Sequence, residues 1–284
     1  MELGLETIGV TLVAILGVSL GRIFSHLKKP YWLFGYFLPL ALIVILVITQ
    51  HISVLSFLPP LSWLVTGEFM FVILALAITM GLTTLLPHLP HKSERFITCV
   101  LMVVFVVRFS VSPFIAPTLL KDDLSNLQTT IGADGICFQS RDYTCGPAAA
   151  VTALKKLGFD AQEGEIAVLA RTSPITGTIP RYLYTAIQSR YGYKGLKCQY
   201  RHFDSIAQLK GQGITLAVVK DAFLSNHCVT VMEVSDRVVV IADPVLGKMN
   251  MSHKQFEKIW RFSGIVLKRD PAPASVQGEP SQSI

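Results

Sequence analysis

The segment DGICFQSRDYTCGPAAAVTALKKLG, residues 134–158, decides the fold of the C-terminal half of this chain. Its second part predicts a helix, because Pro147 suits a first turn and the run of alanines that follows favours helix. Two lysines suit the last turn, and Gly158 ends it. Thr144 or Cys145 caps this helix, so the pattern predicts Cys145 at a helix N-terminus.

That position gives Cys145 a chemical property. The nucleophilic form of a cysteine is its thiolate, and the positive end of a helix dipole stabilises a thiolate. Gly146 leaves room for a substrate backbone to approach. Gln139, six residues upstream, is placed to donate its side-chain amide to an oxyanion together with the backbone N–H of Cys145. The segment therefore predicts a nucleophile with its oxyanion donors.

A nucleophilic cysteine needs a base, and His227 is the candidate. It opens a predicted strand, and Asp243 ends the next one in the sequence Ala-Asp-Pro. The Ser235-Asp236 turn between the strands predicts an antiparallel hairpin, which places the start of one strand beside the end of the other. We therefore expect His227 to take the thiol proton while Asp243 fixes the tautomer and orientation of its imidazole.

The remaining periodic segments of this half predict helices first and a mainly antiparallel sheet afterwards, which is an α+β pattern. Three tyrosines of the helix predicted at 180–191, with Thr176-Gly177-Thr178 before it, either line a substrate cleft or pack in the core. The predicted helices are residues 163–170, 180–191 and 205–209, and the predicted strands are 196–201, 214–220, 227–234, 238–242 and 264–268.

Four elements in this order and spacing resemble the double-glycine peptidase family, the papain-like cysteine peptidases that process leader peptides of bacteriocins and related exported peptides. The resemblance covers residues 134–270 and implies a papain-like fold with Cys145 as nucleophile and His227 as base. It also implies Asp243 as the orienting acid, Gln139 as the oxyanion donor, a leader-bearing peptide or protein as substrate, and no cofactor. The elements are Gln139, Tyr143-Thr144-Cys145-Gly146-Pro147-Ala148-Ala149, His227-Cys228-Val229-Thr230-Val231, and Asp243-Pro244.

The order of the two halves departs from the best-known arrangement of that family. There the peptidase precedes the membrane spans of an ABC exporter and faces the cytoplasm. Here it follows the spans, and no GxxxxGK[ST] sequence for ATP binding occurs. The chain is therefore not itself an ATP-driven exporter. It either works with a separate ABC exporter or processes another substrate.

The N-terminal half has a different composition. The whole chain is 51% hydrophobic and only 15% charged, against about 25% charged in soluble domains. Four apolar runs, residues 3–24, 31–49, 61–86 and 96–120, approach or exceed the roughly 20 helical residues that cross a bilayer. The sequence thus predicts a transmembrane region at 1–120, a linker at 121–133, a peptidase domain at 134–270 and a disordered tail at 271–284.

Basic residues alternate between the loops that connect these runs. The loop after the second run has no Lys or Arg, whereas the first and third runs are followed by Arg22, Lys28 and Lys29 and by Lys92 and Arg95. By the positive-inside rule the two basic loops are cytoplasmic, so the peptidase domain lies outside the cytoplasm, against the family precedent. We expect an integral protein of a bacterial plasma membrane. If one run does not span, the domain moves to the cytoplasm.

Other features of the sequence exclude some functions. The net charge is +6, but no Lys/Arg cluster with interleaved aromatics indicates nucleic-acid binding. The five cysteines include no CxxC pair, which argues against a disulfide framework or a metal site. Glu68 and Arg108 fall inside predicted spans; either they pair across the third and fourth helices, or Arg108 snorkels toward an interface.

The leading functional hypothesis is a membrane-anchored cysteine endopeptidase that cuts a leader or precursor after small residues such as Gly-Gly. The Gly-Gly preference follows from the resemblance alone. Two alternatives stay open at this point. One is a module that binds a leader peptide for a separate exporter without cutting it. The other is an amidase or acyl transferase that uses the same Cys-His chemistry.

Overall fold

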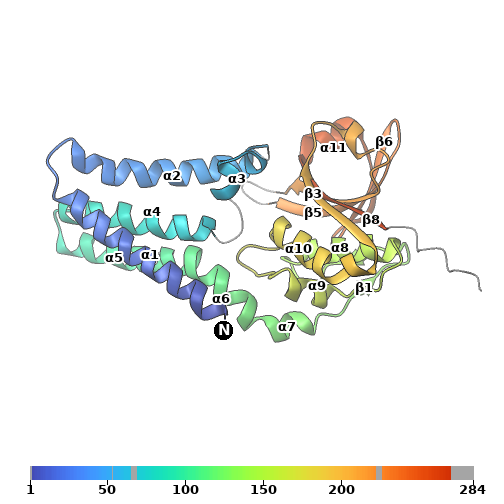
Figure 1. Cartoon of the computed structure of the whole chain (residues 1–284), viewed down its shortest axis with the longest axis horizontal. Helices are drawn as coiled ribbons and strands as arrows, with labels where there is room; N and C mark the ends of the chain where they lie inside the picture. Colours follow the sequence, from blue (N-terminus) through green and yellow to red (C-terminus); the bar gives the residue numbers. More distant parts are fainter. Residues whose placement is uncertain (1, 53, 65–68, 222–225, 270–284) are drawn as a thin grey trace, which may run out of the picture.

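Long apolar runs form long helices in the N-terminal half. The computed structural model describes residues 2–52, 54–64, 69–221 and 226–269, and the tail predicted to be disordered at 271–284 lies outside them. Figure 1 shows an elongated helical bundle at one end of the molecule and a mixed helix and sheet domain at the other. The chain starts at the bundle end nearest the domain.

Four helical segments of the described chain are long and apolar enough to cross a membrane, as the sequence predicted. Short 3-10 turns at Tyr31–Leu33, Leu55–Phe57 (η2) and Leu86–His88, and helix α3 at Leu61–Leu64, connect them. The four segments are α1 (Glu2–Ser25), α2 (Phe34–His51), α4 (Phe69–Leu85), and a continuous helical run made of α5 (Lys92–Val106), a π-helical turn (Val107–Val111) and α6 (Ser112–Leu119).

Glycines bring α1 and α4 together. A Cβ atom added at Gly17 would lie 2.0 Å from Thr79 Oγ1, and one added at Gly21 would lie 2.7 Å from the carbonyl oxygen of Met80. The Thr84 hydroxyl is 3.3 Å from the carbonyl oxygen of Gly21, while it also donates to its own helix. The GxxxG spacing of α1 is therefore a packing surface, as is common between membrane helices.

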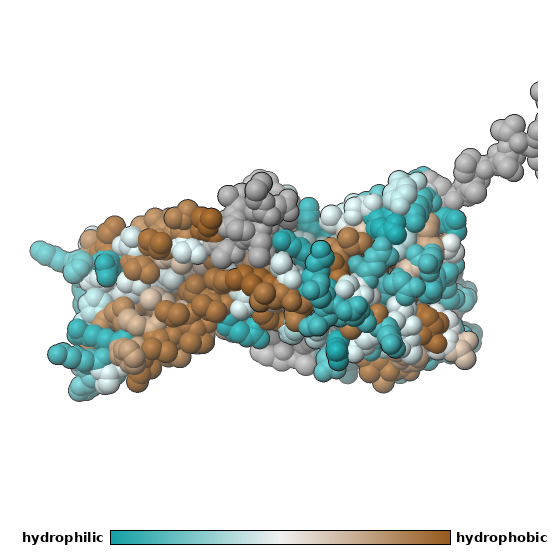
Figure 2. All heavy atoms as spheres, turned by 90° about the horizontal axis from the view of Figure 1, so that it is seen from below, coloured by the Kyte–Doolittle hydropathy of each residue, from teal (hydrophilic) through white to brown (hydrophobic). Residues whose placement is uncertain are grey.

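The surface of the bundle is apolar where lipid is expected. Figure 2 shows hydrophobic side chains over much of the visible face of the helical half, with hydrophilic ones at the end away from the domain. Large apolar residues such as Leu12 and Phe96 are 61% and 70% exposed there. Of the two charges predicted inside spans, Glu68 lies outside the described residues, and the Arg108 guanidinium lies 5.8 Å from the ring centre of Phe109.

The segment predicted as a polar linker is partly structured. Helix α7 (Lys121–Ser125) follows α6, and Leu124 is buried where α7 packs against α9 of the C-terminal half. Gly164 permits this contact, because a Cβ there would lie 2.5 Å from the Leu124 carbonyl oxygen. Strand β1 (Thr130–Ile131) then pairs with β2 (Cys137–Phe138). Because most of the segment is polar, nothing in the sequence indicated that Leu124 would be buried and would anchor it.

The α+β fold predicted for the C-terminal half is confirmed. Helices α8 (Cys145–Lys156), α9 (Glu163–Leu169) and α10 (Pro180–Tyr191) precede a six-stranded antiparallel sheet. The sheet has the strand order β3-β8-β4-β5-β6-β7, and Figure 1 shows it strongly curved. Its strands are β3 (Leu196–His202), β4 (Ile214–Lys220), β5 (Asn226–Val234), β6 (Val238–Asp243), β7 (Gly247–Ser252) and β8 (Trp260–Arg269).

The predicted hairpin and two elements missed by the sequence complete this sheet. Strands β5 and β6 pair antiparallel, with Thr230 opposite Ala242, so the hairpin prediction is confirmed. Strand β7 and helix α11 (His253–Ile259) were not predicted. Half of β7 is exposed and polar, which hides a strand pattern. Helix α11 has a capping box formed by Ser252 and Gln255, a signal that the sequence does contain.

Two apolar cores lie on opposite faces of the sheet. One is made by α8, α10 and the adjoining strands and includes Leu154, Ile187 and Tyr191. The other fills the inside of the curved sheet around Phe256 and Trp260. Tyr191 is fully buried and donates its hydroxyl to the carbonyl of Asp160, so the core alternative applies to this tyrosine.

The glycine contact between α1 and α4 is testable. We expect Gly21→Ala to reduce the free energy of unfolding by about 1–3 kcal/mol, the usual cost of overpacking a close contact. Gly9→Ala in the same helix is the matched control, since nothing lies within 4 Å of an added Cβ there. Thermal unfolding in detergent measures both variants. Equal stability of the two would contradict this packing.

Candidate active site

Cys145 is the first residue of α8, as the sequence predicted. Thr144 occupies the N-cap position, but its side chain does not cap the helix. Its hydroxyl instead donates to the carbonyl of Arg141 at 2.9 Å and accepts the N–H of the same residue at 3.1 Å. The turn before the helix is thereby closed, and backbone N–H groups at the start of α8 remain available to a negative charge at Cys145.

His227 and Asp243 meet at the end of the β5–β6 hairpin. The distance from His227 Nε2 to Asp243 Oδ1 is 3.1 Å, and both side chains are largely buried. Asp243 Oδ1 also accepts the backbone N–H groups of Val245 at 2.7 Å and Leu246 at 3.2 Å. These bonds fix the carboxylate, which in turn fixes the imidazole ring. With Nε2 directed at Asp243, Nδ1 is the nitrogen left for a thiol proton.

Charge interactions favour a protonated His227. Burial alone lowers the pKa of His227, but hydrogen bonds with Asp243 and Cys145 outweigh it and raise the pKa to about 10. Burial alone raises the pKa of Asp243, but the bonds from His227, Val245 and Leu246 lower it below the usual range. An Asp243 carboxylate held in this way can stabilise the imidazolium that would form if Cys145 gave its proton to His227.

Gln139 is hydrogen-bonded through its backbone to the residue that follows Asp243. Its backbone N–H donates to the carbonyl of Pro244, the residue after Asp243, at 3.0 Å. Its side-chain oxygen Oε1 is buried and has no hydrogen-bond partner among the described residues. A buried amide with an unpaired end is costly unless a ligand completes it. Since the two ends of a Gln amide are interchangeable by rotation, this side chain can present an N–H to an oxyanion.

Glu163 is a residue of this region that the sequence analysis missed. Its side chain is fully buried, and its carboxylate accepts the backbone N–H of Ser140 at 2.8 Å and the Ser140 hydroxyl at 2.7 Å. Ser140 follows Gln139 directly, so Glu163 holds the segment that carries the proposed oxyanion donor. No sequence signal distinguishes it, because a Glu in the first turn of a helix is ordinary.

The other cysteines of the domain are kept as thiols. Burial raises the pKa of Cys198 to about 12, and burial together with the negative charge of Glu163 raises the pKa of Cys137 to about 12. Burial, followed by the charges of Cys145 and Asp243, raises the pKa of Cys228 well above its usual value. A reagent that attacks thiolates therefore has little access to these three side chains at neutral pH.

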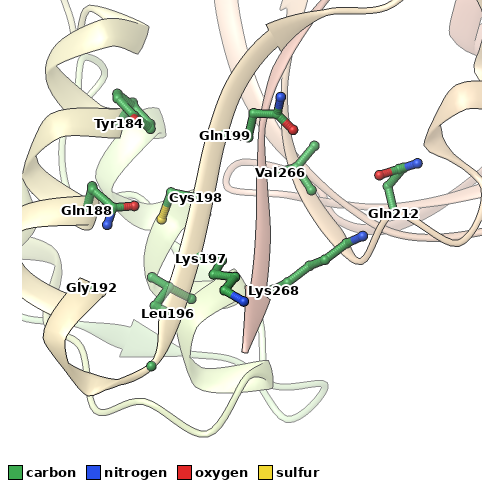
Figure 3. Close-up of a pocket in the computed structure, with 11 residues that line it drawn as sticks. Tyr184, Gln188, Gly192, Leu196, Lys197, Cys198, Gln199, Gln212, Val266 and Lys268 are labelled. Carbon is green, nitrogen blue, oxygen red and sulfur yellow. The ribbon is translucent and has the colours of Figure 1, made fainter. Parts of the chain in front are cut away.

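A cavity elsewhere in the domain contains none of the predicted site residues. It measures about 760 Å³ and lies between α10 and the edge strand β3. Figure 3 shows Tyr184 and Gln188 on the helix facing Cys198 on the strand, with Lys197 and Lys268 nearby. The groups that make up the candidate active site are thus separate from this cavity.

The four predicted site residues all lie within the segment that matches a known family. Residues 134–274 match the family model described as the peptidase C39 family. The chain belongs to this family. The predicted resemblance is thereby confirmed, and the α+β domain is a C39 peptidase domain preceded by four helices that could span a membrane.

Two proteins of Methanothermobacter species are similar to about half of the chain. An uncharacterized protein of Methanothermobacter thermautotrophicus is 29% identical over 143 residues, which are 50% of this chain and 94% of that protein. An uncharacterized protein of Methanothermobacter marburgensis is 28% identical over 148 residues, which are 52% of this chain and 98% of that protein. Each relative is therefore matched over nearly its whole length by about half of this chain.

Solved peptidase domains are also similar to about half of this chain. One is a double glycine motif protease from an AMS/PCAT transporter in complex with the leader peptide, at 16% identity and a TM-score of 0.39, covering 51% of this chain and 96% of that one. Another is the peptidase domain of Streptococcus ComA, a bi-functional ABC transporter, at 20% identity and a TM-score of 0.41, covering 47% and 96%.

The link between Asp243 and His227 predicts a change in pH dependence. Asp243→Asn removes the charge that raises the pKa of His227, so the imidazolium should be lost at lower pH. We expect the alkaline limb of the kcat/KM profile for peptide cleavage to move down by about one to three pH units. Asp236→Asn, which alters an exposed turn carboxylate, should leave the profile unchanged. An unmoved alkaline limb in Asp243→Asn would contradict the coupling.

The assignment of Gln139 predicts a separation of turnover from thiol reactivity. Gln139→Ala should lower kcat by about 10²–10³-fold, the usual effect of losing one oxyanion donor. Alkylation of Cys145 by a small reagent should stay within a few-fold of wild type, because no oxyanion forms in that reaction. Gln199→Ala, at an exposed glutamine of β3, is the matched control. Parallel losses of both rates in Gln139→Ala would point to a structural role instead.

Proposed function

We propose that this protein is a membrane-anchored cysteine endopeptidase that cuts a leader or precursor peptide. The observation that carries the proposal is the convergence of three groups: Cys145 at the N-terminus of α8, and the bonded pair His227–Asp243 beside it. A cysteine placed in this way is activated by its base, and the base is oriented by the acid. Membership of the C39 family supports the same reaction class.

The geometry suits acyl transfer through a thioester. His227 accepts the Cys145 proton, and the thiolate attacks the peptide carbonyl. The resulting oxyanion is stabilised by the Cys145 N–H and by the Gln139 amide. Collapse breaks the peptide bond, and the imidazolium gives its proton to the leaving amine. Water, activated by the same imidazole, then hydrolyses the thioester and restores the thiol.

We further propose that the scissile bond follows small residues such as Gly-Gly and that the domain lies outside the cytoplasm. The residue preference is supported by the family to which the domain belongs. The sidedness is supported by charge, because the basic loops fall at the bundle end remote from the domain. A separate ABC exporter is the proposed partner when the substrate is an exported peptide.

The proposal predicts one reactive cysteine and one cleavage activity that depend on the same residue. In detergent near neutral pH, an iodoacetamide probe should label Cys145 at least ~10-fold faster than the other cysteines of the domain, whose thiolates are suppressed by burial. His227→Ala should slow that labelling. The full-length protein should cut a synthetic peptide with a Gly-Gly junction, and mass spectrometry identifies the bond.

The controls separate a peptidase from a binding module. Cys145→Ala should lose both labelling and cleavage, while Cys228→Ala, which alters a neighbouring buried thiol, should keep both. Cleavage of Gly-Gly but not of Leu-Leu peptides would agree with the proposed preference. If Cys145 reacts like an ordinary thiol and no peptide of a wide panel is cut, the peptidase assignment is wrong and the domain is a binding module.

A further inference from the structure

One loop lies between helix α8, which carries Cys145, and the helical bundle, and it contacts both. The loop 170–179, between α9 and α10, reaches toward the bundle in Figure 1. Its last residue, Ile179, packs against a buried cluster made by three different bundle helices. Phe71 and Phe114 of this cluster lie within two turns of the helix ends that face the domain. The cluster also contains Val10 and Ala75.

The same loop forms a wall beside Cys145. Thr178 precedes Ile179 and packs on Gly146, where an added Cβ would lie 2.9 Å from the Thr178 Cβ. The loop is braced internally: Ser173 and Gly177 exchange backbone hydrogen bonds of 3.1 and 2.8 Å. Only the thickness of this braced loop therefore separates the start of α8 from side chains of the bundle.

A second contact fixes the domain on the bundle. Phe57, in the η2 turn between the second and third spans, has its ring centre 4.9 Å from that of Tyr200 and 6.0 Å from that of His202. Both partners belong to β3, and burial raises the pKa of Tyr200 to about 12. Leu124 of α7 is also buried on α9. The contacts of Ile179, Phe57 and Leu124 therefore hold the domain at the end of the bundle that faces it.

With the four apolar helices in a bilayer, these contacts would set the height of the candidate active site above it. We propose that the substrate is itself inserted in the membrane and is cut a few residues beyond the point where its chain leaves the bilayer. An extended chain advances about 3.3 Å per residue, so a short spacer suffices to reach a thiol that lies one loop away from the spans. This inference rests on the proposed peptidase function and adds the class of substrate.

The test uses full-length protein in lipid nanodiscs and one cleavage segment presented in two ways. The first is a soluble Gly-Gly peptide. The second places the same segment after a single hydrophobic helix of about 20 residues, with flexible spacers of increasing length between helix and scissile bond. We expect efficient cutting with spacers of about three to eight residues, which span roughly 10–26 Å, and slower cutting of the soluble peptide.

A variant at the junction gives an independent readout. Phe57→Ala removes the ring contact with Tyr200 that holds the domain on the bundle, and it changes none of the proposed catalytic residues. It should reduce cutting of the short-spacer substrate at least ~3-fold relative to wild type, a local loss of positioning, while cutting of the soluble peptide is unchanged. Tyr193→Ala, at an aromatic residue that is 74% exposed, is the matched control and should change neither rate.

The outcomes distinguish a failure of the membrane-substrate inference from a failure of the proposed peptidase function. If the soluble peptide is cut in a Cys145-dependent manner but anchored substrates are cut only with spacers above about 15 residues, or no faster than the soluble peptide, the membrane-substrate inference is wrong and the peptidase stands. If Phe57→Ala alters both substrates equally, the junction does not select substrate. If neither substrate is cut and Cys145 shows no special reactivity, the peptidase proposal itself fails.

Discussion

The contact between α8 and β5 is the constraint on which the site depends. Ala148, Ala149 and Ala150 are fully buried and small, so the helix approaches the sheet closely enough for the Thr230 hydroxyl to donate to the Ala149 carbonyl at 2.8 Å. Helix and strand both begin at the site. This one packing contact therefore sets the start of α8, with its thiol, opposite the start of β5, with its imidazole. A larger side chain in the alanine run would separate the two.

Burial decides which thiol can act. Burial raises the pKa of three cysteines of the domain, among them Cys228 next to His227 in sequence, so their thiols stay protonated at neutral pH. Cys145 differs from these three cysteines because it lies at the N-terminus of α8 and has His227 as its proposed base. After burial, the charges of Cys145 and of Asp243 each contribute to the raised pKa of Cys228. The site thus suppresses its nearest competing nucleophile by the same electrostatics that orient its base.

Features with a local signal were predictable from the sequence, and features that arise from long-range contacts were not. The helix at Cys145, the β5–β6 hairpin and the four long apolar helices depend on residues close in the chain, so their patterns were sufficient. Glu163 could not be identified, because its partner Ser140 is 23 positions away and its helix position is ordinary. The roles of Phe57 and Ile179 were equally hidden, since an apolar residue near a span carries no mark of what it will contact.

The junction between the two halves changes what membrane anchoring means for a peptidase. A domain on a free linker gains only local concentration from its anchor. In the arrangement we propose, a domain held at Phe57, Leu124 and Ile179 would also have a fixed height above the bilayer, and the distance of a scissile bond from the bilayer would become a criterion for cutting. A site for small residues such as glycine excludes larger residues, but it makes few contacts by which to distinguish one Gly-Gly segment from another. Fixed height would supply that further discrimination, which gives a physical reason for joining this domain to four apolar helices.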